Sequence, residues 1–187
     1  EKELIRKVLS AMLSGGGNFA EVYLQKSKNN TLKLEDSKIE NAVSGFDLGC
    51  GLRVWKDNRT FYGYVNSIEP KLLLQSAREL GRAAGLGKNP YSLQLSSKQF
   101  EPLEILDNFS LPGNNRKKNI LLEVDEACRK YSKNIVQVSS YIADGQQETY
   151  IANSQGVFSQ FFLQKVILSV NAIARKGKEV RTGHKSF

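Results

Sequence analysis

Two stretches of the chain carry the same pattern of apolar residues, and this repeat limits the folds that are possible. Each stretch starts with residues spaced as on one face of a helix and continues with residues that alternate as on a strand. The helical members lie 116 positions apart: Leu4, Ile5, Val8 and Met12 match Ile120, Leu121, Val124 and Cys128. Residues 20–22 match 136–138 at the same spacing. This pattern predicts a duplicated unit of one helix followed by antiparallel strands.

The first block is expected to hold a helix, several short strands and a second helix. Apolar spacing predicts helices at 3–14 and 70–84, the second with Ser67 as its N-cap and Gly85 at its end. Alternation predicts strands at 20–24, 31–35, 38–44, 48–54 and 60–65. Turn-forming residues separate these strands at Asn29-Asn30, Asp36-Ser37, Gly45 and 56–59.

The second block repeats this order. Apolar spacing predicts a helix at 120–131. Strands are expected at 135–143, 147–152, 157–162, 166–174 and 182–187, with turns at Asp144-Gly145, 153–156 and Gly177.

These elements predict an α+β fold of two layers, in which mainly antiparallel sheets pack against a few helices. We expect a first repeat at 1–86, a proline-containing connector at 87–115 and a second repeat at 116–187. The first repeat closes with the helix near residue 70, and its counterpart in the second would begin near residue 187. The pattern therefore predicts that the second repeat is truncated.

Charge and hydropathy narrow the function class. The formal net charge is +8, and residues 164–187 hold six Lys and Arg residues against Glu179 alone. A basic end can bind nucleic acid, but charges that flank a turn at Gly177 also keep strand ends soluble, and no nucleic-acid-binding motif accompanies them. No apolar run is long enough to cross a bilayer, and the charged start at 1–3 is unlike a signal peptide.

Residues for hydrolytic chemistry are scarce. His184 is the single histidine, so a zinc site or a Ser-His triad has no complete set of side chains. Cys50 and Cys128 both lie in apolar periodic stretches, which favours a pair of reduced core thiols. Gly49 and Gly51 lie within a strand pattern, where they allow a close backbone approach or a bulge. No catalytic or metal-binding residue is therefore assigned.

Aromatic residues gather around the hairpin at 48–65. They are candidates to line a groove for a peptide, although cross-strand packing is the commoner explanation of such clusters. The candidate substrate-binding residues are Trp55, Tyr62 and Tyr64. A sheet edge in such a domain could also accept an extended peptide by strand addition.

Several motifs, in this order, resemble a known family. They are Leu34-Glu35-Asp36-Ser37-Lys38-Ile39-Glu40, then Gly49-Cys50-Gly51-Leu52-Arg53-Val54, then Gly63-Tyr64. Residues 137–139, 150–156 and 166–174 resemble the second block of the same family. The pattern is similar to the N-terminal domain of the TldD/PmbA family, whose members are often labelled modulators of DNA gyrase. The second block resembles the TldD branch more closely than the PmbA branch. Ser37 stands where the family often has Gly.

The resemblance implies a cytoplasmic zinc metallopeptidase that cleaves small or unfolded peptides and works as a homodimer or as a heterodimer with a paralogue. The His-Glu-x-x-x-His zinc motif of the TldD branch is absent here, so zinc is expected in the complete protein and not in these residues. The chain is then the N-terminal, substrate-framing domain of such an enzyme in peptide hydrolysis or maturation. The alternative is a non-enzymatic binding module for a protein partner or for nucleic acid.

Overall fold

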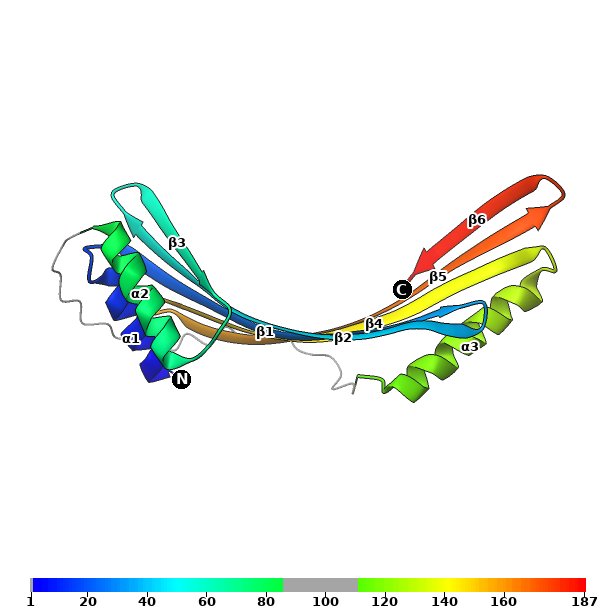
Figure 1. The fold of residues 1–187 in the computed structure, drawn as a ribbon, viewed down its shortest axis with the longest axis horizontal. Coiled ribbons are helices and arrows are strands. Elements are labelled where there is room, and N and C mark those ends of the chain that lie inside the picture. The colour runs from blue at the N-terminus through cyan, green and yellow to red at the C-terminus, as the bar shows by residue number, and fades with distance from the viewer. Residues whose placement is uncertain (1, 86–110) are drawn as a thin grey trace. The chain divides into compact units, whose positions relative to one another are not determined.

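The computed structural model describes residues 2–85 and 111–187 (Figure 1). This part of the chain forms three helices and an antiparallel six-stranded sheet, which confirms the α+β class. The elements follow the order α1 (Lys2–Leu13), β1 (Phe19–Glu35), β2 (Lys38–Lys56), β3 (Arg59–Val65), α2 (Pro70–Ala84), α3 (Asn114–Tyr131), β4 (Ile135–Asn153), β5 (Phe158–Lys176) and β6 (Glu179–Ser186). Among these residues, no helix is long and apolar enough to span a membrane.

The order of elements repeats, as the predicted duplication requires. One helix and three strands occur as α1-β1-β2-β3 and again as α3-β4-β5-β6. The strands lie in the sheet as β3-β2-β1-β4-β5-β6, an order that is symmetric about its centre. Lys56 pairs with Arg59 at one hairpin end and Lys176 with Glu179 at the other, so these strands are 120 positions apart.

The described residues divide into two compact units that are interleaved along the chain. Unit 1 contains residues 2–27, 47–85 and 147–163, and unit 2 contains residues 28–46, 111–146 and 164–187. Each long strand passes from one unit into the other, so each unit receives segments from both predicted repeats. The division of the sequence at 1–86, 87–115 and 116–187 stays a prediction, and residues 87–110 of its connector lie outside the described residues.

Three predicted turns are wrong, because the strands run through them. Asn29-Asn30 lies inside β1, Gly45 inside β2 and Asp144-Gly145 inside β4. Polar side chains in and next to these segments bond across the strands within unit 2: Asn30 Nδ2 donates to Asp144 Oδ1 at 3.1 Å, and Ser44 Oγ donates to Asn30 Oδ1 at 2.9 Å. Residues that are typical of turns therefore serve here as cross-strand partners. The predicted break in β5 at 163–165 is wrong in the same way.

The short hairpin turns are confirmed, but one helix cap is not. Asp36-Ser37 has φ of 46° and 64°, and Asp57-Asn58 has φ of 48° and 63°, as tight turns between twisted strands require. The N-cap position of α2 is Glu69, not Ser67. Ser67 Oγ instead accepts a hydrogen bond from the Glu69 N–H at 3.0 Å, while the fixed φ of Pro70 suits the first turn.

Unit 1 has a dense apolar core between its helices and one face of its strands. Inward residues of β2 alternate with outward ones, and Cys50, Leu52 and Val54 are fully buried. The two helices touch closely: a Cβ on Gly81 would lie 2.6 Å from the Ala11 carbonyl oxygen. This contact fixes α2 against α1.

Unit 2 has a smaller apolar core and several buried polar groups. Leu32, Leu34, Leu121 and Ile142 form its buried cluster. Lys117 and Asp125 of α3 and Asp144 of β4 are also buried, so charged contacts join the helix to the strands.

Candidate functional site

The three predicted substrate-binding residues lie on one face of unit 1. Tyr62 pairs with Arg53 and Tyr64 with Gly51, so both tyrosines share the outward face of β2 with Trp55. Trp55, Tyr62 and Tyr64 are 44%, 65% and 56% exposed. The structure brings them together on the face opposite the helices, while their role in binding stays a prediction.

Two glycines let the tyrosine rings lie directly over the backbone of β2. A Cβ on Gly49 would lie 2.1 Å from the Tyr64 hydroxyl oxygen, and one on Gly51 would lie 2.9 Å from that of Tyr62. The sequence predicted that Gly49 and Gly51 allow a close approach to the backbone, and the groups that approach are the two tyrosine rings. Larger residues at these two positions would lift the rings off the strand.

An aromatic and charged cluster continues this face. The rings of Phe19 and Trp55 are tilted by 33° with centroids 4.9 Å apart. The Arg53 guanidinium lies 5.1 Å from the Trp55 ring centroid and donates to Glu21 at 2.6 Å. A cation held over an aromatic ring by a carboxylate limits the rotamers of all three side chains. We name Phe19, Trp55, Tyr62 and Tyr64 the aromatic face.

Strand β3 is an end strand of the sheet, beside the aromatic face. Its inner side pairs with β2 from Cys50 to Lys56, and no described strand pairs with its outer side. An end strand presents N–H and C=O groups that an extended peptide can pair with. A peptide added there would contact Tyr62 and Tyr64.

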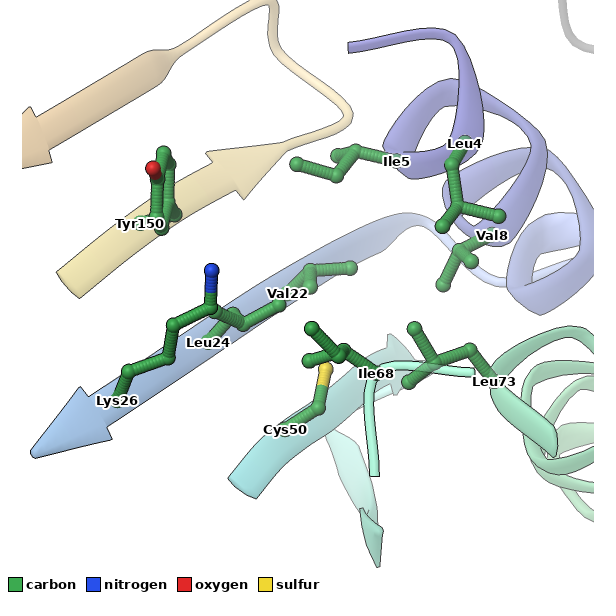
Figure 2. A pocket seen from close by; sticks show the side chains of 10 residues that line it. All are labelled: Leu4, Ile5, Val8, Val22, Leu24, Lys26, Cys50, Ile68, Leu73 and Tyr150. Carbon is green, nitrogen blue, oxygen red and sulfur yellow. The ribbon is translucent and has the colours of Figure 1, made fainter. Parts of the chain in front are cut away.

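A cavity of about 90 Å³ lies in unit 1 on the face that the helices cover (Figure 2). Its polar end is occupied by internal contacts, since Lys26 Nζ lies 3.9 Å from the Glu148 carboxylate and 5.9 Å from the Tyr150 ring centroid. Burial raises the pKa of the Cys50 thiol to about 12, so Cys50 stays protonated and is no nucleophile. The other lining residues are Leu4, Ile5, Val8, Val22, Leu24, Ile68 and Leu73.

Metal-binding geometry is absent from residues 2–85 and 111–187, where no three His, Cys, Asp or Glu side chains gather around one point. His184 lies on β6 opposite Asn171, and its Nε2 is 3.1 Å from Ser186 Oγ. These residues do not fit a zinc ion, so we derive no hydrolytic step for them.

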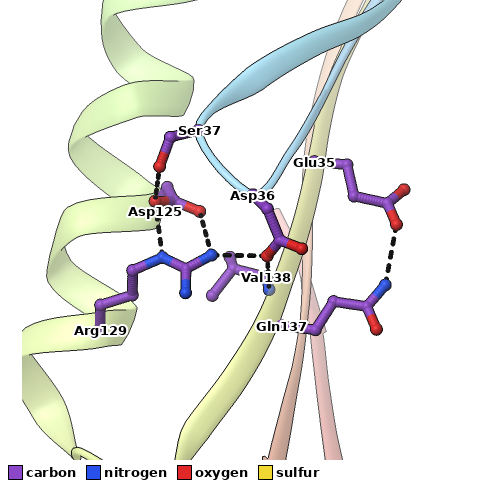
Figure 3. A network of polar contacts seen from close by, with 7 residues as sticks. All are labelled: Glu35, Asp36, Ser37, Asp125, Arg129, Gln137 and Val138. Carbon is purple, nitrogen blue, oxygen red and sulfur yellow. Dashed lines mark hydrogen bonds and ion pairs between the residues drawn. The ribbon is translucent and has the colours of Figure 1, made fainter.

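The acidic residues near the β1–β2 turn are held in a network of unit 2 (Figure 3). Asp36 accepts from the Val138 N–H at 3.1 Å and from Arg129 at 2.5 Å. Ser37 Oγ donates to Asp125 at 2.7 Å, and Arg129 Nε donates to the same carboxylate at 3.0 Å. Ser37 has a positive φ, which costs conformational energy for any residue except glycine. The hydrogen bond from Ser37 Oγ to Asp125 offsets this cost, so serine is tolerated at this position.

This network predicts a pH-dependent stability. The Val138 N–H, and then Arg129, hold the pKa of the Asp36 carboxyl below its usual 3.8. Because the folded pKa is lower than the unfolded one, Asp36 stabilises the fold above pH 3.8, and this contribution is lost as the pH falls through the folded pKa. We expect Asp36→Asn to make the free energy of unfolding fall less steeply below this pH, as measured by urea denaturation. An equally steep fall in the variant would contradict this role.

The basic residues of the β5–β6 hairpin lie on both of its faces, and most of them lie on one. Ala174 pairs with Arg181, so these two residues point the same way. Arg175 follows Ala174 along the strand and therefore points to the opposite face. Alternation places Lys176 and Lys185 on the face of Arg181, together with Glu179, so three cations lie on one face of the hairpin.

A buried ion pair is the main feature that the sequence did not reveal. Lys117 of α3 is ion-paired with Asp144 of β4, and their side chains are 2% and 1% exposed. The sequence pattern predicts a turn at Asp144 and a helix that begins only at residue 120, and both predictions are wrong because β4 continues through Asp144 and α3 begins at Asn114. A signal was present, because Lys117, Leu121 and Asp125 follow helical spacing on one face.

Comparisons with known families match most of the chain. Residues 20–84 match the family model described as PmbA/TldA metallopeptidase domain 1. Residues 107–187 match the model described as the central domain of the same metallopeptidases.

Individual relatives are distant. A metalloprotease of Methanocaldococcus jannaschii is 23% identical over 97% of this chain and 40% of its own length. A crystal structure of a proposed modulator of DNA gyrase from Thermotoga maritima has a TM-score of 0.73 and 16% identity, covering 99% of this chain and 42% of that one. TldE from Thermococcus kodakarensis has a TM-score of 0.58 and 17% identity over 99% of this chain and 42% of its own. The chain thus spans about two fifths of the length of these proteins, whose likeness at this identity shows the fold.

Proposed function

The chain belongs to the PmbA/TldD metallopeptidase family, and we propose that it frames an extended peptide substrate as the N-terminal part of such an enzyme. The observation that carries this proposal is the open side of β3 beside the aromatic face. Main-chain pairing at an end strand binds peptides of many sequences, and exposed rings next to it supply apolar contacts. Both features suit a peptidase that takes unfolded or small peptides.

Hydrolysis and peptide maturation belong to the complete gene product in this proposal. Zinc needs ligands from outside residues 2–85 and 111–187, because the described side chains form no donor set. The proposal also includes a homodimer, or a heterodimer with a paralogue, and action in the cytoplasm. Both parts follow from the family resemblance. Gyrase modulation is the weaker candidate, since no nucleic-acid-binding motif accompanies the basic residues of the hairpin.

The aromatic face gives the test. We expect Tyr62→Ala combined with Tyr64→Ala to weaken binding of a fluorescein-labelled, unstructured decapeptide by about tenfold or more, because two exposed ring contacts are lost. Fluorescence anisotropy with the complete gene product measures this affinity.

Tyr141→Ala is the matched control, because Tyr141 is 37% exposed on β4 in unit 2 and lies outside the aromatic face. It should change the affinity by less than about twofold. Equal losses in the control and in the double variant, or none in either, would remove the aromatic face from substrate binding.

A further inference from the structure

Unit 2 has a groove with a volume of about 590 Å³ that no helix among residues 2–85 and 111–187 covers. It lies between the last turns of α3 and the strands β5 and β6. Helix α3 contributes Ala127, Cys128 and Tyr131, and the strands contribute Ala172, Ala174 and Gly183. Each of these residues that line the groove has a counterpart in unit 1 at the spacing of the repeat. In unit 1, α2 covers the counterparts.

The helix side of the groove corresponds to the surface where α2 meets α1. A spacing of 116 relates Ala127 to Ala11 and Tyr131 to Gly15. In unit 1 these counterparts touch α2: a Cβ on Gly15 would lie 1.7 Å from the Gly81 carbonyl oxygen, and one on Gly81 would lie 2.6 Å from the Ala11 oxygen.

The strand side corresponds to the surface where α2 covers β2 and β3. A spacing of 120 relates Gly183 to Gly63 and Ala174 to Val54. A Cβ on Gly63 would lie 3.8 Å from Leu80 of α2, whereas one on Gly183 would meet no atom within 4 Å. Val54 is fully buried, and Ala174 is half-buried. The same surface is thus covered in unit 1 and open in unit 2.

We propose that this groove is the seat of an amphipathic helix, which packs on α3 and β6 as α2 packs on α1 and β3. The packing of α2 in unit 1 shows how a helix would lie in this groove. The residues that differ between the two repeats indicate which side chains the bound helix should carry. Ala172 and Ala174 replace Leu52 and Val54, so the occupant needs bulky aliphatic side chains to fill the space.

Two further substitutions define the rest of the occupant. Tyr131 replaces Gly15, so the helix lies farther from the end of α3 than α2 lies from α1. Arg181 replaces Phe61 in the wall, which favours an acidic residue on the incoming helix. The occupant is therefore an amphipathic helix with a Leu-rich strip and a carboxylate beside it.

A synthetic helix tests the seat on the 187-residue chain. The probe is a stapled peptide with the sequence of residues 70–84 carrying Ala77→Leu, Gly81→Leu and, in the last turn beside the expected place of Arg181, Ala83→Glu. The two cysteines give the readout, because Cys128 is partly exposed in the groove whereas Cys50 is fully buried. We expect the probe to slow the reaction of Cys128 with a maleimide in proportion to its occupancy, and Cys50 to stay unreactive as long as the protein is folded.

Adjacent residues of β6 supply matched variants. Gly183→Glu places a carboxylate in the groove, and His184→Glu places one on the opposite face of the strand. A carboxylate at position 183 lies against the leucine strip of the probe and competes with its glutamate for Arg181, so Gly183→Glu should weaken binding of the probe at least about tenfold and His184→Glu less than about twofold.

Four outcomes would overturn the proposal. The first is that the probe gives Cys128 no protection. The second is that a probe whose leucine strip is broken by Leu73→Glu and Leu80→Glu protects Cys128 equally well. The third is that the two protein variants have equal effects on binding of the probe. The fourth is protection that rises with protein concentration alone, which would assign the groove to a second copy of the chain.

Discussion

Replacing Lys117 by Met is expected to lower the free energy of unfolding by about 3–5 kcal/mol, because it leaves the Asp144 carboxylate buried without its cation. The two side chains are 2% and 1% exposed, so water cannot replace the lost partner. Asn30 donates one hydrogen bond to Asp144 at 3.1 Å, which does not neutralise the charge. Urea denaturation followed by far-ultraviolet circular dichroism measures the change.

Lys118→Met is the matched control, because Lys118 is the next residue of α3 and is exposed. Its expected change is within about 0.5 kcal/mol. A double variant with Lys117→Met and Asp144→Asn should be more stable than Lys117→Met alone, since it removes the unpaired charge and keeps an acceptor for Asn30. Equal effects at positions 117 and 118 would show that the ion pair does not hold α3 to the strands.

Gly15→Ala is expected to destabilise unit 1 by about 2–3 kcal/mol, the upper range for overpacking a core. The new Cβ would lie 1.7 Å from the Gly81 carbonyl oxygen and 2.6 Å from that of Gly85. Backbone atoms cannot rotate away as a side chain can, so α2 must move from α1. Fluorescence of Trp55, the single tryptophan, reports the unfolding of unit 1.

Gly45→Ala and Gly183→Ala serve as controls, because a Cβ at either position meets no atom within 4 Å. Both should leave the Trp55 unfolding transition within about 0.5 kcal/mol of the unmodified chain. A Gly15→Ala variant as stable as these controls would contradict the tight contact between α1 and α2.

Local signals predicted the helices and the short hairpins well. The apolar spacing of α1, α2 and α3 and the turns at Asp36-Ser37 and Asp57-Asn58 follow from residue types within a few positions of each other. The long strands were predicted as fragments, because Asn29-Asn30, Gly45 and Asp144-Gly145 are typical of turns. Their partners lie on neighbouring strands, and a sequence pattern does not show which strands are neighbours.

The candidate site was predicted in part. Alternation in β2 and β3 indicated that Trp55, Tyr62 and Tyr64 share a face, since successive residues point to opposite sides. The contact between Arg53, Trp55 and Glu21 depends on the pairing of β1 with β2 and has no local signal. The predicted core position of Cys128 was also incomplete, because it is partly exposed in the groove of unit 2.

The sequence by itself determined the element types, the family resemblance and the repeat of about 116 positions, because these depend on residue spacing along the chain. The tertiary structure decided which segments form each compact unit, which charges are buried and which surface stays uncovered. These features depend on contacts between distant segments, whose burial makes an ion pair such as Lys117–Asp144 costly to break. The structure thus shows how the two copies of the repeat differ. In unit 1 the surface formed by α1, β2 and β3 is covered by α2, whereas the corresponding surface of unit 2 is covered by no described helix.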